Sequence, residues 1–300
     1  MLRLKRFGHL PLVTLLAAVL SLEAGEPQQA PEKPLPELNS FLQGVRKKLH
    51  SDRLLLSQYT YNEKVTVERL DKNGKIKDTE VRVYEVYPSL EKRRTYRRLI
   101  SKNGKPLSAK ELEENDKKQQ KKTLEGARKA NVESAGERQR RLAREAEERR
   151  KEEEAIDEAF RMYDIRRLGR EVIDGQEVIQ FAFTPRPGFK PQTESGKILK
   201  KFAGRAWFGE RDFELVRIDM RMLEDFSLGW GILARLGKGA TVTAQRHRVN
   251  DEIWLPASSR FSGNLRVLLF KGIRANVTQE FSDYKKFTVD TSVTFQGVKP

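Results

Sequence analysis

From residue 164 to residue 286 the chain repeats one pattern, in which short runs of alternating apolar and polar residues are separated by brief polar turns. The dipeptides Asp174-Gly175 and Asn250-Asp251 each stand between two such runs. Alternation with a period of two indicates strands with one buried face, and short turns of this kind join antiparallel neighbours. Hairpin after hairpin, with few helices, predicts an α+β chain built on a curved antiparallel sheet, an incomplete β-barrel whose concave face is covered by helices.

An N-terminal helix is predicted to begin at Ser40, which forms a capping box with Gln43. The helix should end by about residue 57. Its apolar residues recur at helical spacing and predict one buried face, made by Phe41, Leu42, Val45 and Leu49.

A hairpin follows, because residues 59 to 87 alternate around the turn Asn73-Gly74. Its register depends on the length of the loop. An even loop sets Val65 opposite Arg82, whereas an odd loop sets it opposite Val83. We favour the odd loop, with Gly74 at or near a left-handed position, because apolar residues then share one face.

Residues 108 to 162 form a charged insertion that is predicted to be a helical hairpin. Ser108 and Glu111 make a capping box, the composition favours helix, and a break is expected near residues 131 to 136. The end of the insertion should dock onto the sheet through Ile156, Ala159, Phe160 and Tyr163. The insertion is either a solvated structural element or an arm that binds an envelope protein. A further short amphipathic helix is expected over residues 194 to 202.

The N-terminus predicts export. A cationic start precedes an apolar stretch from residue 10 to residue 22, and Ala24-Gly25 supplies a small-residue cleavage site, so residues 1 to 24 are predicted to be a signal peptide and the protein to be periplasmic. Leu22 fits the cleavage site poorly, which leaves an uncleaved membrane anchor as the alternative. Residues 25 to 37 form a Pro-rich linker, and residues 38 to 300 a single β domain interrupted by the charged insertion.

Composition narrows the possible functions. The chain has no cysteine, which excludes a disulfide framework and a thiol nucleophile, and an exported chain of this kind is more typical of bacteria. The net charge is +16, but the most charge-dense segment, residues 108 to 170, carries 18 Lys and Arg against 16 Asp and Glu. A nucleic-acid partner is therefore not expected. The spread-out excess favours either a basic surface near anionic envelope components or a purely solubilising surface.

No catalytic or metal-binding pattern is present in the sequence. His9 lies in the predicted signal peptide, and neither His50 nor His247 has a carboxylate at metal-ligand spacing. Nucleophile elbows, phosphate-binding loops and dinucleotide fingerprints are absent. A pair of glycosidase carboxylates is the one hydrolytic alternative that the sequence leaves open. We expect a protein that is not an enzyme and needs no cofactor.

Three segments resemble the LolA/LolB-like proteins of the bacterial envelope, a superfamily that includes the stress sensor RseB. They are a Trp strand, acidic turn and alternating strand over residues 204 to 219, a turn and Trp-x-Pro strand over 249 to 256, and a closing strand over 281 to 287. The resemblance implies a half-barrel with a helical lid around an apolar cavity, and it carries no catalytic residue. It also implies a partner that is a lipid, a lipoprotein or an acyl chain.

Candidate ligand-binding residues lie on one predicted strand and beside two tryptophans. Methionine adapts to varied acyl shapes, although a plain sheet core explains the same stripe. Trp230 lies in an apolar segment flanked by glycines, which is either a lip that touches ligand or membrane or an ordinary buried strand. The candidates are Trp207, Val216, Ile218, Met220, Met222 and Trp230. The alternative function is an envelope regulatory or scaffold module whose cavity is filled by side chains.

Overall fold

The computed structural model describes residues 33–49, 58–87, 95–131, 134–228, 234–267 and 273–286. The signal peptide, its cleavage site at Ala24 and Gly25, and most of the Pro-rich linker lie outside the described residues, as does Trp230. All the elements belong to the unit that begins at Leu35.

The described residues form four helices: α1 (Leu38–Leu49), α2 (Ala109–Asn131), α3 (Ala135–Met162) and α4 (Glu194–Leu199). Helix α1 begins two residues before the predicted capping box. The Glu37 carboxylate accepts hydrogen bonds from the backbone amides of Asn39 at 2.8 Å and Ser40 at 2.6 Å, so Glu37 caps the helix in place of Ser40. The expected end of the helix near residue 57 falls outside the described residues.

The two helices predicted for the charged insertion are confirmed as α2 and α3. Ser108 and Glu111 bind each other's side chain and backbone at the start of α2, and Ser134 and Glu137 form a complete capping box at the start of α3. Among the helices that the structure describes, none is long and apolar enough to cross a membrane.

The remaining elements are strands of one antiparallel sheet. They are β1 (Tyr59–Leu70), β2 (Ile76–Tyr87), β3 (Tyr96–Lys102), β4 (Lys105–Pro106), β5 (Tyr163–Ile173), β6 (Gln176–Pro185), β7 (Phe202–Gly209), β8 (Leu215–Met222), β9 (Phe226–Leu228), β10 (Ala234–Leu236), β11 (Thr241–Val249), β12 (Ile253–Val267) and β13 (Ile273–Lys286).

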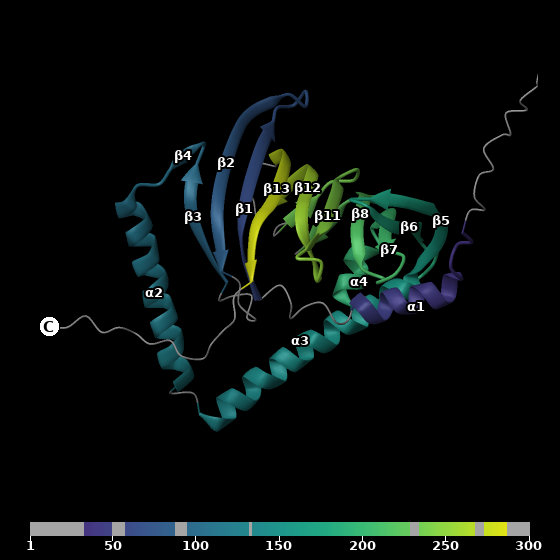
Figure 1. The fold of residues 1–300 in the computed structure, drawn as a ribbon, viewed down its shortest axis with the longest axis horizontal. Helices are drawn as coiled ribbons and strands as arrows, with labels where there is room; N and C mark the ends of the chain where they lie inside the picture. The colour runs from purple at the N-terminus through teal and green to yellow at the C-terminus, as the bar shows by residue number, and fades with distance from the viewer. Residues whose placement is uncertain are drawn as a thin grey trace, which may run out of the picture. The chain divides into compact units, whose positions relative to one another are not determined.

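The sheet is curved and open, as predicted (Figure 1). Its strand order is β4-β3-β2-β1-β13-β12-β11-β8-β7-β6-β5, and β9 and β10 form a small ribbon beside β12. In the sequence, the charged insertion (α2 and α3) lies between strands β1 to β4 and strands β5 to β13. These two groups of strands form one sheet because β13 pairs with β1. Helices α1 and α4 and the C-terminal end of α3 gather near β5 to β8 in Figure 1.

The predicted register of the first hairpin is wrong. The loop is odd and Gly74 has a φ of 81°, as expected, and Leu70 pairs with Ile76. A register shift at Arg69/Leu70 then moves the pairing by one residue, so Val65 lies opposite Arg82. A face that mixes valines with charged residues is tolerated here because these side chains are not fully buried.

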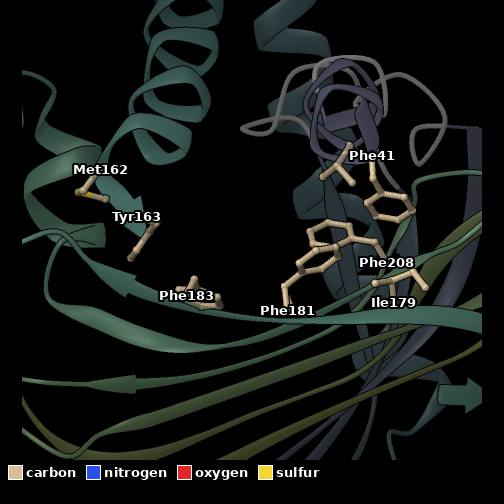
Figure 2. Close-up of a cluster of buried hydrophobic side chains, with 9 residues drawn as sticks. Phe41, Met162, Tyr163, Ile179, Phe181, Phe183 and Phe208 are labelled. Atoms are coloured by element: carbon tan, nitrogen blue, oxygen red, sulfur yellow. The ribbon is translucent and has the colours of Figure 1, made fainter. Parts of the chain in front are cut away.

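The largest cluster of buried apolar side chains in the described part of the chain lies between β5 to β8 and the helices. Phe41 of α1 is central to it, with its ring centroid 5.5 Å from that of Phe181 and 5.2 Å from that of Phe213. Figure 2 shows Phe41, Ile179, Phe181 and Phe208 gathered beneath α1. Helix α1 therefore packs on the sheet through the face that its spacing predicts.

Candidate functional site

An apolar pocket with a volume of about 180 Å³ lies within this cluster and is open to solvent on one side. Strands β5 to β8 form its sheet wall, and α1, α3 and α4 form its helix wall. The lining side chains are those of Leu42, Val45, Ala159, Phe160, Tyr163, Ile165, Phe181, Phe183, Leu199, Ala206, Phe208, Ile218 and Met220.

The sheet wall follows from the alternation of strand side chains. On β6, Phe181 and Phe183 face the pocket, and Ala182 between them faces the other side of the sheet. On β7, Ala206 and Phe208 face the pocket in the same way. Phe183 lies beside Tyr163, with ring centroids 5.0 Å apart, at the left of Figure 2. Aromatic residues thus supply half of the side chains of the sheet wall, and Ala206 leaves space between them.

Helix α1 is held over the sheet by ion pairs and by a close backbone approach. Lys48 lies 2.9 Å from the buried carboxylate of Glu214, and Arg46 lies 2.6 Å from Asp157 of α3. A Cβ at Gly44 would meet the Phe213 ring at 2.8 Å, so only glycine lets α1 approach this closely.

Helix α4 is fastened to α3 by a buried carboxylate. Glu158 has 1% of its surface exposed, and it accepts hydrogen bonds from the Gln192 amide, the Thr193 hydroxyl and, at 3.0 Å, the Thr193 amide. Thr193 in turn caps α4 through the Gly196 amide at 2.8 Å. Burial alone raises the pKa of Glu158, but these hydrogen bonds and nearby Arg161 outweigh it and leave that pKa below its ordinary value.

Only one side chain in the lining carries a polar atom. The hydroxyl of Tyr163 donates to the backbone carbonyl of Leu199 at 2.5 Å, and burial raises the pKa of this phenol. The phenol is therefore neutral and already satisfied at neutral pH. No metal-binding group of His, Cys, Asp and Glu is found among the residues that the structure describes. The pocket can hold an apolar group, and none of its lining side chains is a nucleophile or a base.

The four predicted ligand-binding residues of β8 do not all lie at the pocket. Ile218 and Met220 line the pocket, and Met222 is buried beside it with Phe202 and Ala240. Val216 packs instead with two tryptophans in a separate cluster, because a register shift between β7 and β8 lies next to it.

The tryptophans at 207 and 254 both lie in that separate cluster, away from the pocket. Trp207 stands between Ala206 and Phe208 on β7, so it points to the opposite face of the sheet. Its indole donates to Glu171 at 3.0 Å, and the indole of Trp254 donates to Asp212 at 2.8 Å. The second bond joins the acidic turn of one resembling segment to the Trp-x-Pro strand of another, which gives both segments a structural role.

Several pocket residues were not among the predicted candidates. Their signals were present in the sequence: the apolar face of α1 and the end of the charged insertion both predict packing on the sheet, and both do so. The sequence does not show that both helices pack on the same side of β6 and β7. In the structure, Leu42 of α1 and Ala159 and Phe160 of α3 line one pocket together with Phe181 and Phe208 of the sheet.

Comparison with known proteins returns similar structures but no similar sequence. No family model matches the chain, and neither does any curated protein. A LolA-superfamily protein from Nitrosomonas europaea is similar over 83% of this chain and 94% of its own, with 9% identity and a TM-score of 0.32. A domain of a putative outer membrane lipoprotein-sorting protein from Vibrio parahaemolyticus is similar over 84% of this chain and 94% of its own, with 10% identity and a TM-score of 0.30.

A third similar structure is a complex of MucA and MucB from Pseudomonas aeruginosa, which covers 81% of this chain and 93% of its own, with 10% identity and a TM-score of 0.21.

Proposed function

We propose that this chain is an exported, non-enzymatic protein that binds the acyl chain of a lipid or a lipidated protein in the apolar pocket. The observation that carries the proposal is the lining itself: hydrocarbon side chains from both walls surround a cavity, and its one polar group is already bonded. We further propose that residues 1 to 24 direct export to the periplasm, and that residues 108 to 162 are an insertion into a single domain.

The size of the cavity limits how much ligand it holds in this state. A protein cavity of about 150 Å³ accommodates benzene, so 180 Å³ holds a comparable apolar group. This corresponds to roughly six carbons of an acyl chain. At about 0.8 kcal/mol per methylene, their burial contributes about 5 kcal/mol before the costs of association. A longer chain must either extend into solvent or move the helix wall.

Met220→Glu tests the proposal, because this side chain lines the pocket and is only half-buried. A carboxylate there can reach water, so we expect the variant to fold and to lose binding of a fluorescent long-chain fatty acid. Met220→Leu keeps the site apolar and is the matched control, with binding within about threefold of wild type. Circular dichroism and ligand titration on both variants make the measurement.

A second variant covers the case in which the charge unfolds the domain. Ala159→Phe fills the cavity from α3 without adding a charge, and we expect it to fold and to bind the same fatty acid weakly or not at all. A folded wild type that binds no fatty acid contradicts the proposal and favours the protein-interaction module. Undiminished binding by a folded Ala159→Phe variant contradicts it as well, since the ligand would then lie elsewhere.

A further inference from the structure

The segment from residue 186 to residue 201, which contains α4 and which we call the α4 rim, combines positive charge with an exposed apolar side chain. It carries five basic residues and one acidic residue. Ile198 has 39% of its surface exposed. Its neighbour Leu199 lines the pocket. One short helix therefore presents one side to the cavity and another side to solvent.

The basic side chains of the α4 rim fall into two groups. Lys200 and Lys201 support the fold: the Lys200 ammonium donates to the Phe189 carbonyl at 2.6 Å, and Lys201 pairs with Glu224 at 2.8 Å. The second group consists of Arg186, Lys190 and Lys197, which are exposed. Within the described residues, Arg186 and Lys190 have no ion pair, and Lys197 pairs only with the exposed Glu194.

We propose that the α4 rim is a docking surface for an anionic phospholipid bilayer, placed at the pocket so that an acyl chain can pass between membrane and cavity. This deepens the proposed function and rests on it. Exposed cations are drawn to an anionic lipid surface, and an exposed isoleucine among them can enter the interface. An acyl chain that leaves the pocket past Leu199 would place its head group close to the cations of the α4 rim.

Vesicle binding tests the proposal with the full chain. Sedimentation with vesicles of mixed phosphatidylglycerol and phosphatidylcholine is compared with sedimentation with phosphatidylcholine alone. The test variant is R186Q/K190Q/K197Q, which leaves the two structural lysines in place. Each cation near an anionic surface strengthens partitioning about fivefold, so the loss of three predicts about 100-fold weaker partitioning into the anionic vesicles. Ile198→Ser should weaken it further.

The matched control removes three exposed lysines from α2, in the variant K118Q/K121Q/K122Q. It has the same net charge as the test variant, and we expect it to bind anionic vesicles within about threefold of wild type. High salt should weaken wild-type binding, because the attraction is screened.

The proposal is overturned if wild type shows no preference for the anionic vesicles, or if the α2 variant loses as much binding as the α4 variant. The fatty-acid titration without vesicles distinguishes failure of this membrane-docking proposal from failure of the proposed acyl-chain binding in the pocket. Met220→Glu should lose fatty-acid binding and keep vesicle binding. The R186Q/K190Q/K197Q variant should lose vesicle binding and keep fatty-acid binding.

Discussion

Replacing Gly196 with alanine probes how α4 is held beside the pocket. A Cβ at this buried position would lie 2.0 Å from Oε2 of Glu158, far inside van der Waals contact. The alanine therefore has to displace the Glu158 carboxylate, which binds the backbone and side chain of Thr193 through the same oxygen. The substitution should break this attachment while adding only one methyl group.

The expected magnitude follows from the bonds at risk. Hydrogen bonds to a charged group contribute about 1.5 to 3 kcal/mol each, so losing one or two of them predicts that Gly196→Ala lowers the free energy of unfolding by about 3 kcal/mol. In a Glu158→Ala background the closest obstacle is gone, and only Thr193 Oγ1, at 2.9 Å from the added Cβ, still has to shift slightly. Alanine is the better helix former by up to about 1 kcal/mol, which offsets this shift, so the same Gly196→Ala change should then be close to neutral.

Urea denaturation at neutral pH of wild type, both single variants and the double variant measures the difference as a coupling energy of about 3 kcal/mol. Gly136→Ala is the matched control, because Gly136 also lies in a helix but a Cβ there would meet nothing within 4 Å. It should not lower stability. An equal loss from Gly196→Ala in both backgrounds would refute the reasoning.

Two further predictions concern acid and the insertion. Because the folded pKa of Glu158 lies below its ordinary value of 4.5, its stabilisation is complete above that pH and is lost as pH falls through the lower folded pKa; urea midpoints should therefore show that Glu158→Gln removes this part of the acid sensitivity. Replacing residues 110 to 154 with a Gly/Ser linker retains Glu158 and the pocket residues of α3. Cooperative unfolding should survive it, with a loss of at most about 2 kcal/mol, and loss of cooperativity would place the insertion in the core.

Local patterns predicted the elements well, because each depends on neighbours in the chain. The Asp174-Gly175 turn joins β5 to β6 as expected, with both residues at positive φ. Ser108 begins α2 through its capping box. In these places the residue types that form the turn or cap are themselves the signal.

Bulges explain both errors in strand facing. A single extra residue reverses every later side chain, and nothing in the alternation marks where it is inserted. The shift at Arg69/Leu70 reverses the predicted pairing of Val65, and the shift between β7 and β8 separates Val216 from Ile218. A stripe that looks continuous in the sequence is therefore divided between two clusters.

The pocket was beyond local patterns for a different reason. Phe181 and Phe183 alternate visibly on β6, but which of their faces receives the helices depends on where α1 and α3 cross the sheet. Val45 of α1 and Phe160 of α3 stand more than a hundred residues apart and meet the same cavity. Such long-range packing is a property of the folded chain and has no counterpart in a single segment.

The two walls of the pocket differ in how readily they can move. The sheet wall is fixed by backbone ladders that join β5 to β8, so widening it would break many backbone hydrogen bonds. Within the described part of the chain, helix α1, on the other side, shares no backbone ladder with the sheet and is held by side chains alone. These are the part-exposed Arg46–Asp157 pair, which contributes little to stability, the Lys48–Glu214 pair and the packing of Phe41. Each further buried methylene contributes about 0.8 kcal/mol. A ligand longer than the cavity should therefore displace α1 and leave the sheet as it is.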